Sequence, residues 1–197
     1  RTAGAQSIRA VDAGNPTVEG SASTTVVAAA PAVLRFLAQP PAGVAGQPLS
    51  PAPSVEIRDA FGNRTSSAAS VTLTLAAGPA GATLSGTTLA PAVAGVAAFP
   101  NLLLDRAGPG YALLASAGAL GSSTSAGFTV AVGPATHYAV SGPASATAGV
   151  PVGYAVQALD AFSNVATSYS GTAAVTSSDP AATLPSTVAF AAGQATA

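Results

Sequence analysis

The sequence repeats itself after about 100 residues. Asp59-Ala60-Phe61-Gly62-Asn63 returns 101 residues later as Asp160-Ala161-Phe162-Ser163-Asn164. Two other landmarks return at nearly the same spacing: Pro31-Ala32 as Pro134-Ala135, and Ala82-Thr83-Leu84 as Ala182-Thr183-Leu184. This period is too long for a solenoid repeat and matches a β-sandwich domain of roughly 100 residues. The chain is therefore predicted to be a tandem array of such domains.

The landmarks also predict the domain boundaries. Residues 30–133 hold one complete copy, and residues 134–197 cover the N-terminal two-thirds of a following copy. Residues 1–29 match the C-terminal strands of a preceding copy, because Arg1-Thr2-Ala3-Gly4 corresponds to Arg106-Ala107-Gly108. We expect one complete and two partial repeats, and the chain to be a window on a longer array.

Apolar residues alternate with polar ones over short runs. Val55 and Ile57 fall on one face of a strand, and Glu56 and Arg58 fall on the other. Runs with Gly, Pro, Ser or Asn between them recur along the chain: 33–37, 71–75, 96–99, 111–115, 128–132, 138–140, 154–159 and 173–176. Residues 1–29 add two expected strands with Ile8, Val11, Val18 and Val26 as apolar residues. Short strands at this spacing predict an all-β sandwich.

Composition excludes several classes of partner. Lys is absent, and six Arg against seven acidic residues give a formal net charge of −1, so no nucleic-acid partner is expected. No apolar stretch long enough to span a bilayer is free of Pro and charge, so no membrane insertion is expected. Without Cys the chain has neither disulfides nor thiolate metal sites.

Catalytic motifs are missing. The sequence has no Gly-x-Ser-x-Gly, no Gly-x-Gly-x-x-Gly and a single histidine, His137, for which packing or an interface is the favoured role. Glu56 and Asp59 stand three apart on a strand and point to opposite faces. Asp59 and Asn63 supply two oxygens, whereas Ca²⁺ needs 6–8. We predict no enzyme, and no catalytic, cofactor or metal site.

The repeated pentapeptide predicts a structural turn formed by Asp59, Gly62 and Asn63, and by Asp160 and Asn164. Asp accepts hydrogen bonds from backbone amides two residues on, while Gly and Asn tolerate positive φ. Because Ser163 replaces Gly62 in the second copy, Asn164 is the residue expected there in the left-handed conformation.

At these turns the chain resembles the bacterial immunoglobulin-like repeats of large surface proteins and adhesins, in which a strand ending in Asp-x-x-Gly-Asn is common. Three further segments carry the resemblance: 84–88, 95–99 and 107–111. It implies immunoglobulin-like sandwiches in an extracellular array on the bacterial cell surface. Tyr111, after a Gly/Pro turn, is either a core aromatic or the tyrosine corner of such a sandwich.

Three functions remain open. The first is a structural stalk or filament-forming array, which we favour because the surface is rich in Thr, Ser, Ala and Gly and has little charge. The second is an adhesive module for carbohydrate or a host protein, and the third is an accessory repeat of a secreted enzyme. The expected partners are neighbouring repeats and, by strand complementation between the two partial units, other copies in a head-to-tail filament.

Overall fold

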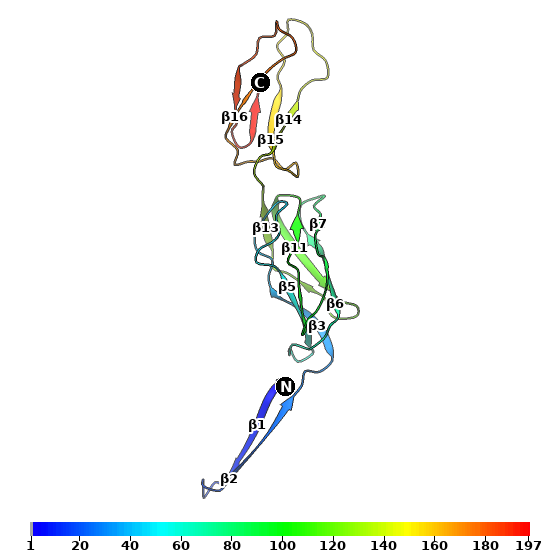
Figure 1. The fold of residues 1–197 in the computed structure, drawn as a ribbon, viewed down its shortest axis with the longest axis vertical. Coiled ribbons are helices and arrows are strands. Elements are labelled where there is room, and N and C mark those ends of the chain that lie inside the picture. Colours follow the sequence, from blue (N-terminus) through cyan, green and yellow to red (C-terminus); the bar gives the residue numbers. More distant parts are fainter. Residues whose placement is uncertain (1) are drawn as a thin grey trace.

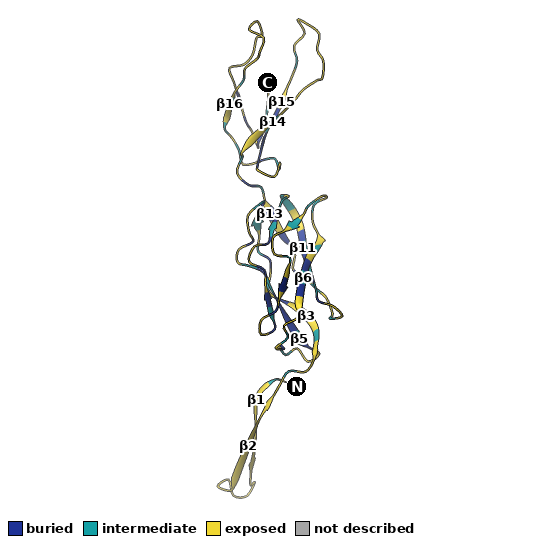
Figure 2. Ribbon diagram, turned by 45° about the vertical axis from the view of Figure 1, so that its right-hand side comes forward, coloured by how far each residue is buried: buried dark blue, intermediate teal, exposed yellow. Residues whose placement is uncertain are grey.

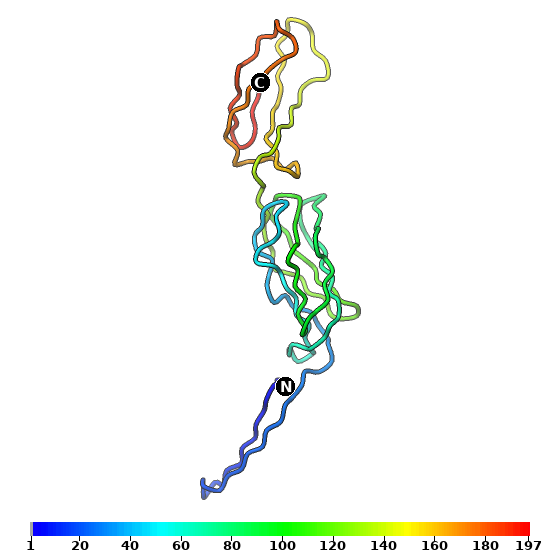
Figure 3. Tube along the Cα trace, in the orientation of Figure 1, coloured from blue at the N-terminus to red at the C-terminus, as the bar shows by residue number. Residues whose placement is uncertain are grey.

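The computed structural model describes residues 2–197, so the start of the expected first segment, Arg1, lies outside the described residues. The described chain is all-β, with strands arranged in several separate sheets and no helix. Its three segments follow one another along the long axis (Figures 1 and 3). We call residues 2–29 the N-terminal hairpin, 30–133 the middle unit and 134–197 the C-terminal unit.

The N-terminal hairpin consists of β1 (Gly4–Val11) and β2 (Glu19–Val26), paired in unbroken antiparallel register from Gly4↔Val26 to Val11↔Glu19. Every residue of both strands is exposed. Ile8 and Val26 share a face of the hairpin, but Val11 lies on the opposite face and Val18 precedes β2. The two expected strands are present and contain Ile8, Val11 and Val26, whereas Val18 lies one residue before β2.

The middle unit contains two sheets. The first is a three-stranded antiparallel sheet with the order β3-β5-β9. The second has the order β4-β13-β11-β6-β8, with β12 also on β11, and only β4 and β13 pair in parallel. The short strands β7 and β10 pair with each other. The strand bounds are β3 Pro31–Ala38, β4 Gly43–Val44, β5 Ser54–Asp59, β6 Ser70–Ala77, β7 Leu84–Ser85, β8 Leu89–Pro91, β9 Val96–Ala98, β10 Leu103–Leu104, β11 Gly108–Ser116, β12 Ser123–Thr124 and β13 Phe128–Ala131.

The core of the middle unit lies between these sheets. Alternation along each strand sends one set of side chains inward, so β5 contributes Val55 and Ile57 while β11 contributes Leu113 and Ala115. Both sheets supply fully buried residues to one cluster. This arrangement is a β-sandwich.

The C-terminal unit repeats part of this plan. Its first sheet has the order β14-β15-β18, like β3-β5-β9, and its second sheet pairs β16 with β17, like β6 with β8. The strand bounds are β14 His137–Ser141, β15 Ala155–Leu159, β16 Thr172–Ala174, β17 Thr187–Ala189 and β18 Gln194–Thr196. Its buried cluster is small, and Figure 2 shows the dark buried colour concentrated in the middle unit.

A two-residue turn before β9 recurs before β18. Ala94 and Gly95 both have positive φ, of 49° and 78°, and Ala192 and Gly193 repeat this with 50° and 74°. Positive φ at both central residues is the conformation of a type I′ hairpin turn. In each unit the glycine lies so close to a backbone carbonyl, of Thr65 or of Ala166, that a Cβ would overlap it.

Candidate functional site: the joints between units

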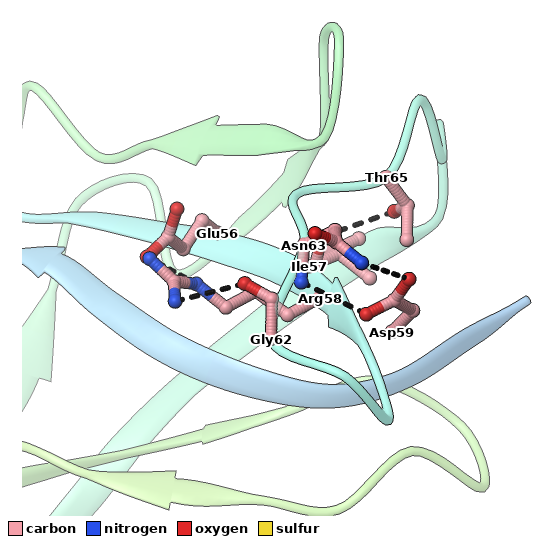
Figure 4. A network of polar contacts seen from close by, with 7 residues as sticks. All are labelled: Glu56, Ile57, Arg58, Asp59, Gly62, Asn63 and Thr65. Carbon is pink, nitrogen blue, oxygen red and sulfur yellow. Dashed lines mark hydrogen bonds and ion pairs between the residues drawn. The ribbon is translucent and has the colours of Figure 1, made fainter. Parts of the chain in front are cut away.

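The repeated pentapeptide forms a tight turn at the end of β5. Asp59 Oδ1 accepts hydrogen bonds from the backbone N–H groups of Phe61 and Asn63, at 2.9 and 2.8 Å. Its Oδ2 accepts from Asn63 Nδ2 at 2.9 Å (Figure 4). The backbone N–H of Asp59 donates to the carbonyl of Asn63, which closes the loop. Asp59 is buried even though its loop projects from the end of the sandwich.

The same turn follows β15. Asp160 Oδ1 accepts from the N–H groups of Phe162 and Asn164, both at 2.9 Å, and the Asn164 amide donates to the carboxylate. The residues with positive φ are Gly62, at 84°, and Ser163, at 64°. The prediction that Asn164 takes the left-handed conformation was wrong. Neither Asn63 nor Asn164 has positive φ, because the residue before each of them, Gly62 or Ser163, takes the left-handed position of the turn.

We call the contact between consecutive segments a joint. At the first joint, between the N-terminal hairpin and the middle unit, the turn after β5 binds the hairpin at two points. Asn63 Oδ1 accepts a hydrogen bond from the N–H of Ala3, just before β1, at 2.9 Å. Asp59 Oδ2 accepts from the N–H of Ala29, beyond the end of β2, also at 2.9 Å. The turn therefore binds both ends of the hairpin base, 26 residues apart in sequence.

The second joint repeats both contacts. Asn164 Oδ1 accepts from the N–H of Ala107 at 3.0 Å, and Asp160 Oδ2 accepts from the N–H of Gly133 at 3.0 Å. Ala107 precedes β11 and Gly133 follows β13, so these donors stand where Ala3 and Ala29 stand at the first joint. One motif thus forms the same two-point contact between consecutive units twice in the chain.

The second joint has two further contacts. Asn164 Nδ2 donates to the carbonyl of Asp105 at 2.8 Å. The ring of Phe162 lies directly against Gly46 of the middle unit, where a Cβ would overlap the ring. Gly46 has φ of 76°, so glycine is favoured there both by the backbone conformation and by the approach of the ring.

The turn after β5 has its own support within the middle unit. Arg58 donates to Glu56 Oε1 from Nε at 2.7 Å and to the carbonyl of Gly62 from Nη1 at 3.0 Å. Thr65 Oγ1 donates to the carbonyl of Ile57 at 3.0 Å. Figure 4 shows the Arg58 contacts on one side of the loop and the Asp59–Asn63 contacts on the other. The corresponding residues of the C-terminal unit are Gln157, Leu159 and Ala166, which cannot make these bonds.

The joint carboxylates are held in the ionised form. Burial alone raises the pKa of Asp59, but hydrogen bonds from Asn63, Ala29 and Phe61 outweigh it and lower the pKa to about 2. Burial likewise opposes ionisation of Asp160, and hydrogen bonds from Asn164, Gly133 and Phe162 lower its pKa below the ordinary value. Each carboxylate is therefore a structural acceptor at neutral pH.

Tyr111 combines the two roles considered from sequence. Its side chain is fully buried and stacks on Phe128 with ring centroids 5.5 Å apart. Its hydroxyl donates to the carbonyl of Arg106 at 2.6 Å, five residues upstream, which is the contact of a tyrosine corner. Burial raises the pKa of the hydroxyl, which keeps it protonated as a donor. This bond fixes the chain beside Ala107, one of the donors of the second joint.

Other kinds of site have little support in residues 2–197. No group of three or more His, Asp or Glu side chains in this range could hold a metal ion. His137 lies exposed at the start of β14, with Nδ1 3.0 Å from Oγ1 of Thr136. The described chain also has no helix suited to crossing a membrane.

Comparisons with known proteins place the chain in no family. No protein-family model matches it, and no curated protein sequence matches it. Among solved structures it is similar to two crystal structures of β-glucuronidase from Parabacteroides merdae, one of them with glycerol in the active site. Identities are 16% and 17%, and TM-scores are 0.38 and 0.36. The matches cover 65% and 61% of this chain but 16% of either glucuronidase, and a likeness this low carries no argument about activity.

Proposed function

We propose that this chain is a non-catalytic structural repeat region of a bacterial extracellular surface protein, in which immunoglobulin-like sandwiches stack end to end as a stalk. The observation that carries the proposal is the repeated joint. Asp59 with Asn63, and Asp160 with Asn164, make the same pair of contacts to the preceding segment. A motif that recurs in order to join units is what an array requires.

Two features support the immunoglobulin-like part of the proposal. The middle unit packs two sheets around one core, and Tyr111 makes the bond of a tyrosine corner. The C-terminal unit uses the same strand orders for the strands that it has. The bacterial and extracellular parts rest on the resemblance of the Asp-x-x-Gly-Asn turn to surface-protein repeats.

The joints support a stiff array. Each connection is only a few residues long, and a proline lies in it (Pro134) or directly after it (Pro31, the first residue of β3), so it has little freedom to bend. Asp and Asn side chains within the turn of one unit accept from backbone N–H groups of the preceding segment, so hydrogen bonds with defined directions set the relative orientation of the units. A stalk needs this rigidity, whereas a flexible linker would have none of these contacts.

Small-angle X-ray scattering of the full chain tests the proposal. We expect the distance distribution of an elongated particle, and Asp160→Ala should broaden it because the contact with Gly133 and the positioning of Asn164 are lost. Asp179→Ala is the matched control, since Asp179 accepts from the N–H of Ala181 in a turn of the same unit away from the joint. Circular dichroism checks that each variant is folded. A compact wild-type particle, or equal scattering from Asp160→Ala, would overturn the proposal.

A further inference from the structure

The C-terminal unit leaves uncovered an inner face that is buried in the middle unit. Val140 pairs with Val156 just as Phe36 pairs with Val55, so Val140 and Phe36 are equivalent positions. Phe36 is 5% exposed, whereas Val140 is 64% exposed. Tyr138 is 42% exposed, although its counterpart Leu34 is 5% exposed. Together with neighbouring residues this face forms an apolar groove of about 440 Å³, lined among others by Val140, Tyr154, Val156, Val175, Leu184 and Val188.

The strands that cover this face in the middle unit are β11 and β13. Leu113 and Ala115 of β11 and Val130 of β13 belong to the same buried cluster as Phe36. β11 pairs along the edge of β6 that β8 leaves free. In the described C-terminal unit β16, the counterpart of β6, pairs with β17 only. The groove therefore has the shape and the open strand edge to receive two antiparallel strands.

The N-terminal hairpin is the counterpart of β11 and β13. Its ends at Ala3 and Ala29 bind the next turn as Ala107 and Gly133 do. The register of β1 and β2 gives it two unlike faces. One face carries Ile8 and Val26 with small residues, and with Gln6 and Thr24 between them. The other face carries mainly Ser and Thr with the Arg9–Glu19 ion pair, and its one large apolar side chain, Val11, lies at the end of β1. The apolar set is Ile8, Ala10, Ala22 and Val26.

Within residues 2–197 no other segment covers the face of the hairpin that carries Ile8 and Val26. Ile8 is 78% exposed, and both strands are exposed along their whole length. An isolated two-stranded hairpin is marginally stable in water, so this element gains most by pairing with a sheet. The hairpin and the groove thus each have the apolar face and the strand edge that the other needs.

We propose that the groove of the C-terminal unit binds the β1–β2 hairpin of a second copy of this chain. The idea rests on the proposed function, since it treats the hairpin and the C-terminal unit as parts of one kind of repeat. The hairpin inserts with Ile8 facing the groove and Arg9 and Glu19 facing water. β1 adds to the free edge of β16, and β2 lies beyond β1, as β13 lies beyond β11.

The middle unit sets the register. β11 has a bulge between Gly108 and Tyr111, so it contains one residue more than its partner β13 over this stretch. β1 pairs with β2 without a bulge and therefore lacks this extra residue. Counted from the equivalent starts of the two strands, Ala10 corresponds to Ala115. Ala115 pairs with Leu73. Ala173 pairs with Val188 as Val71 pairs with Ala90, so Ala173 and Val71 are equivalent positions. Two residues further along each strand, Val175 is therefore equivalent to Leu73. Ala10 of one copy therefore lies opposite Val175 of the other.

The resulting assembly is head to tail. The inserted hairpin remains attached to its own middle unit through Ala3 and Ala29. That middle unit therefore follows the C-terminal unit of the first copy through a joint of the same type as the two within the chain. Such a contact uses different surfaces on the two copies, so it propagates as an open filament.

Sedimentation velocity of the full chain over a wide range of concentrations tests the proposal. The wild type should form dimers and longer chains as concentration rises. Ile8→Asp places a charge on the inserted face and should weaken association at least about tenfold, since a buried unpaired charge is strongly disfavoured. Ser7→Asp is the matched control, because it adds the same charge to the same strand on the opposite face. It should associate like the wild type.

Disulfide trapping tests the register independently. The chain has no cysteine, so a copy carrying Ala10→Cys mixed with a copy carrying Val175→Cys should give a cross-linked dimer on oxidation. Val11→Cys with Val175→Cys should give little, because Val11 points to the other face. A wild type that stays monomeric, association insensitive to Ile8→Asp, or equal trapping at positions 10 and 11 would overturn the proposal. A monomer with elongated scattering would overturn this assembly and leave the stalk function standing.

Discussion

Replacing Asn164 with Ala should loosen the second joint while leaving both units folded. The Asn164 amide makes two bonds across the joint, accepting from the N–H of Ala107 at 3.0 Å and donating to the carbonyl of Asp105 at 2.8 Å. One such bond contributes a net 0.5–1.5 kcal/mol, so their loss should weaken the joint by about 1–3 kcal/mol. The ratio of closed to open joint should fall by a factor of about 5–150.

The distance between two spin labels measures this change. Thr74 of β6 and Ser178 of the C-terminal unit are exposed, and the absence of native cysteine allows both to be replaced by labelled Cys. In the wild-type background we expect one narrow distance distribution by pulsed electron resonance. Asn164→Ala should broaden it or add a second population.

The control is Asn15→Ala, which removes an asparagine that accepts from Thr17 in the exposed turn of the N-terminal hairpin. It should leave the distribution unchanged. If Asn164→Ala also leaves a single narrow distribution, the side chain does not hold the joint, and the assignment of the repeated motif to joining units is wrong.

Two other predictions concern the turn itself. Gly62→Ser should destabilise the middle unit by about 1 kcal/mol and Ser163→Gly should stabilise the C-terminal unit by about 0.5–1 kcal/mol, because a residue other than Gly is strained at positive φ; guanidinium denaturation measures both, and no effect at Gly62 would contradict the turn geometry. Since the pKa of Asp59 is lowered from 3.8 to about 2, its contribution should be fully present above about pH 4 and be lost as the pH falls towards 2. Label distances across the first joint that change between pH 7 and 5 would contradict this assignment.

Much of the fold could be predicted from the alternation of apolar residues. The runs around Val55 and Val71 are strands because one face of each is buried, and period-two alternation records that burial. β4, β7, β10 and β12 were not predicted, since two residues are too few to show a period. β8, β17 and β18 were not predicted either, because each is only three residues long with a single inward-facing position, and pairing with β6, β16 and β15 positions them.

The role of the pentapeptide could be predicted only in part. Its Asp and Gly fit a turn, and the sequence shows this directly. Its contacts to Ala3 and Ala107 join residues 60 and 57 positions apart, so they depend on how consecutive units pack together. The sequence around the pentapeptide contains no signal for them. One signal was present nevertheless. Asn is kept in both copies although Gly62 becomes Ser163, so the residue that tolerates positive φ best is replaced while Asn is retained.

In the proposed stalk, the two-point contact at each joint decides how tension passes from one unit to the next. A pull along the axis passes from one unit to the next through the connection after β13, which by itself would peel that strand from the sandwich. The turn also holds Ala107 at the start of β11, the antiparallel neighbour of β13, and Gly108 pairs with Val130 at that same end. Both strands are therefore loaded together and in the same direction, and their mutual hydrogen bonds bear little shear. Loss of the Asn contact should therefore lower the force at which the preceding sandwich unfolds, because β13 alone would then carry the load.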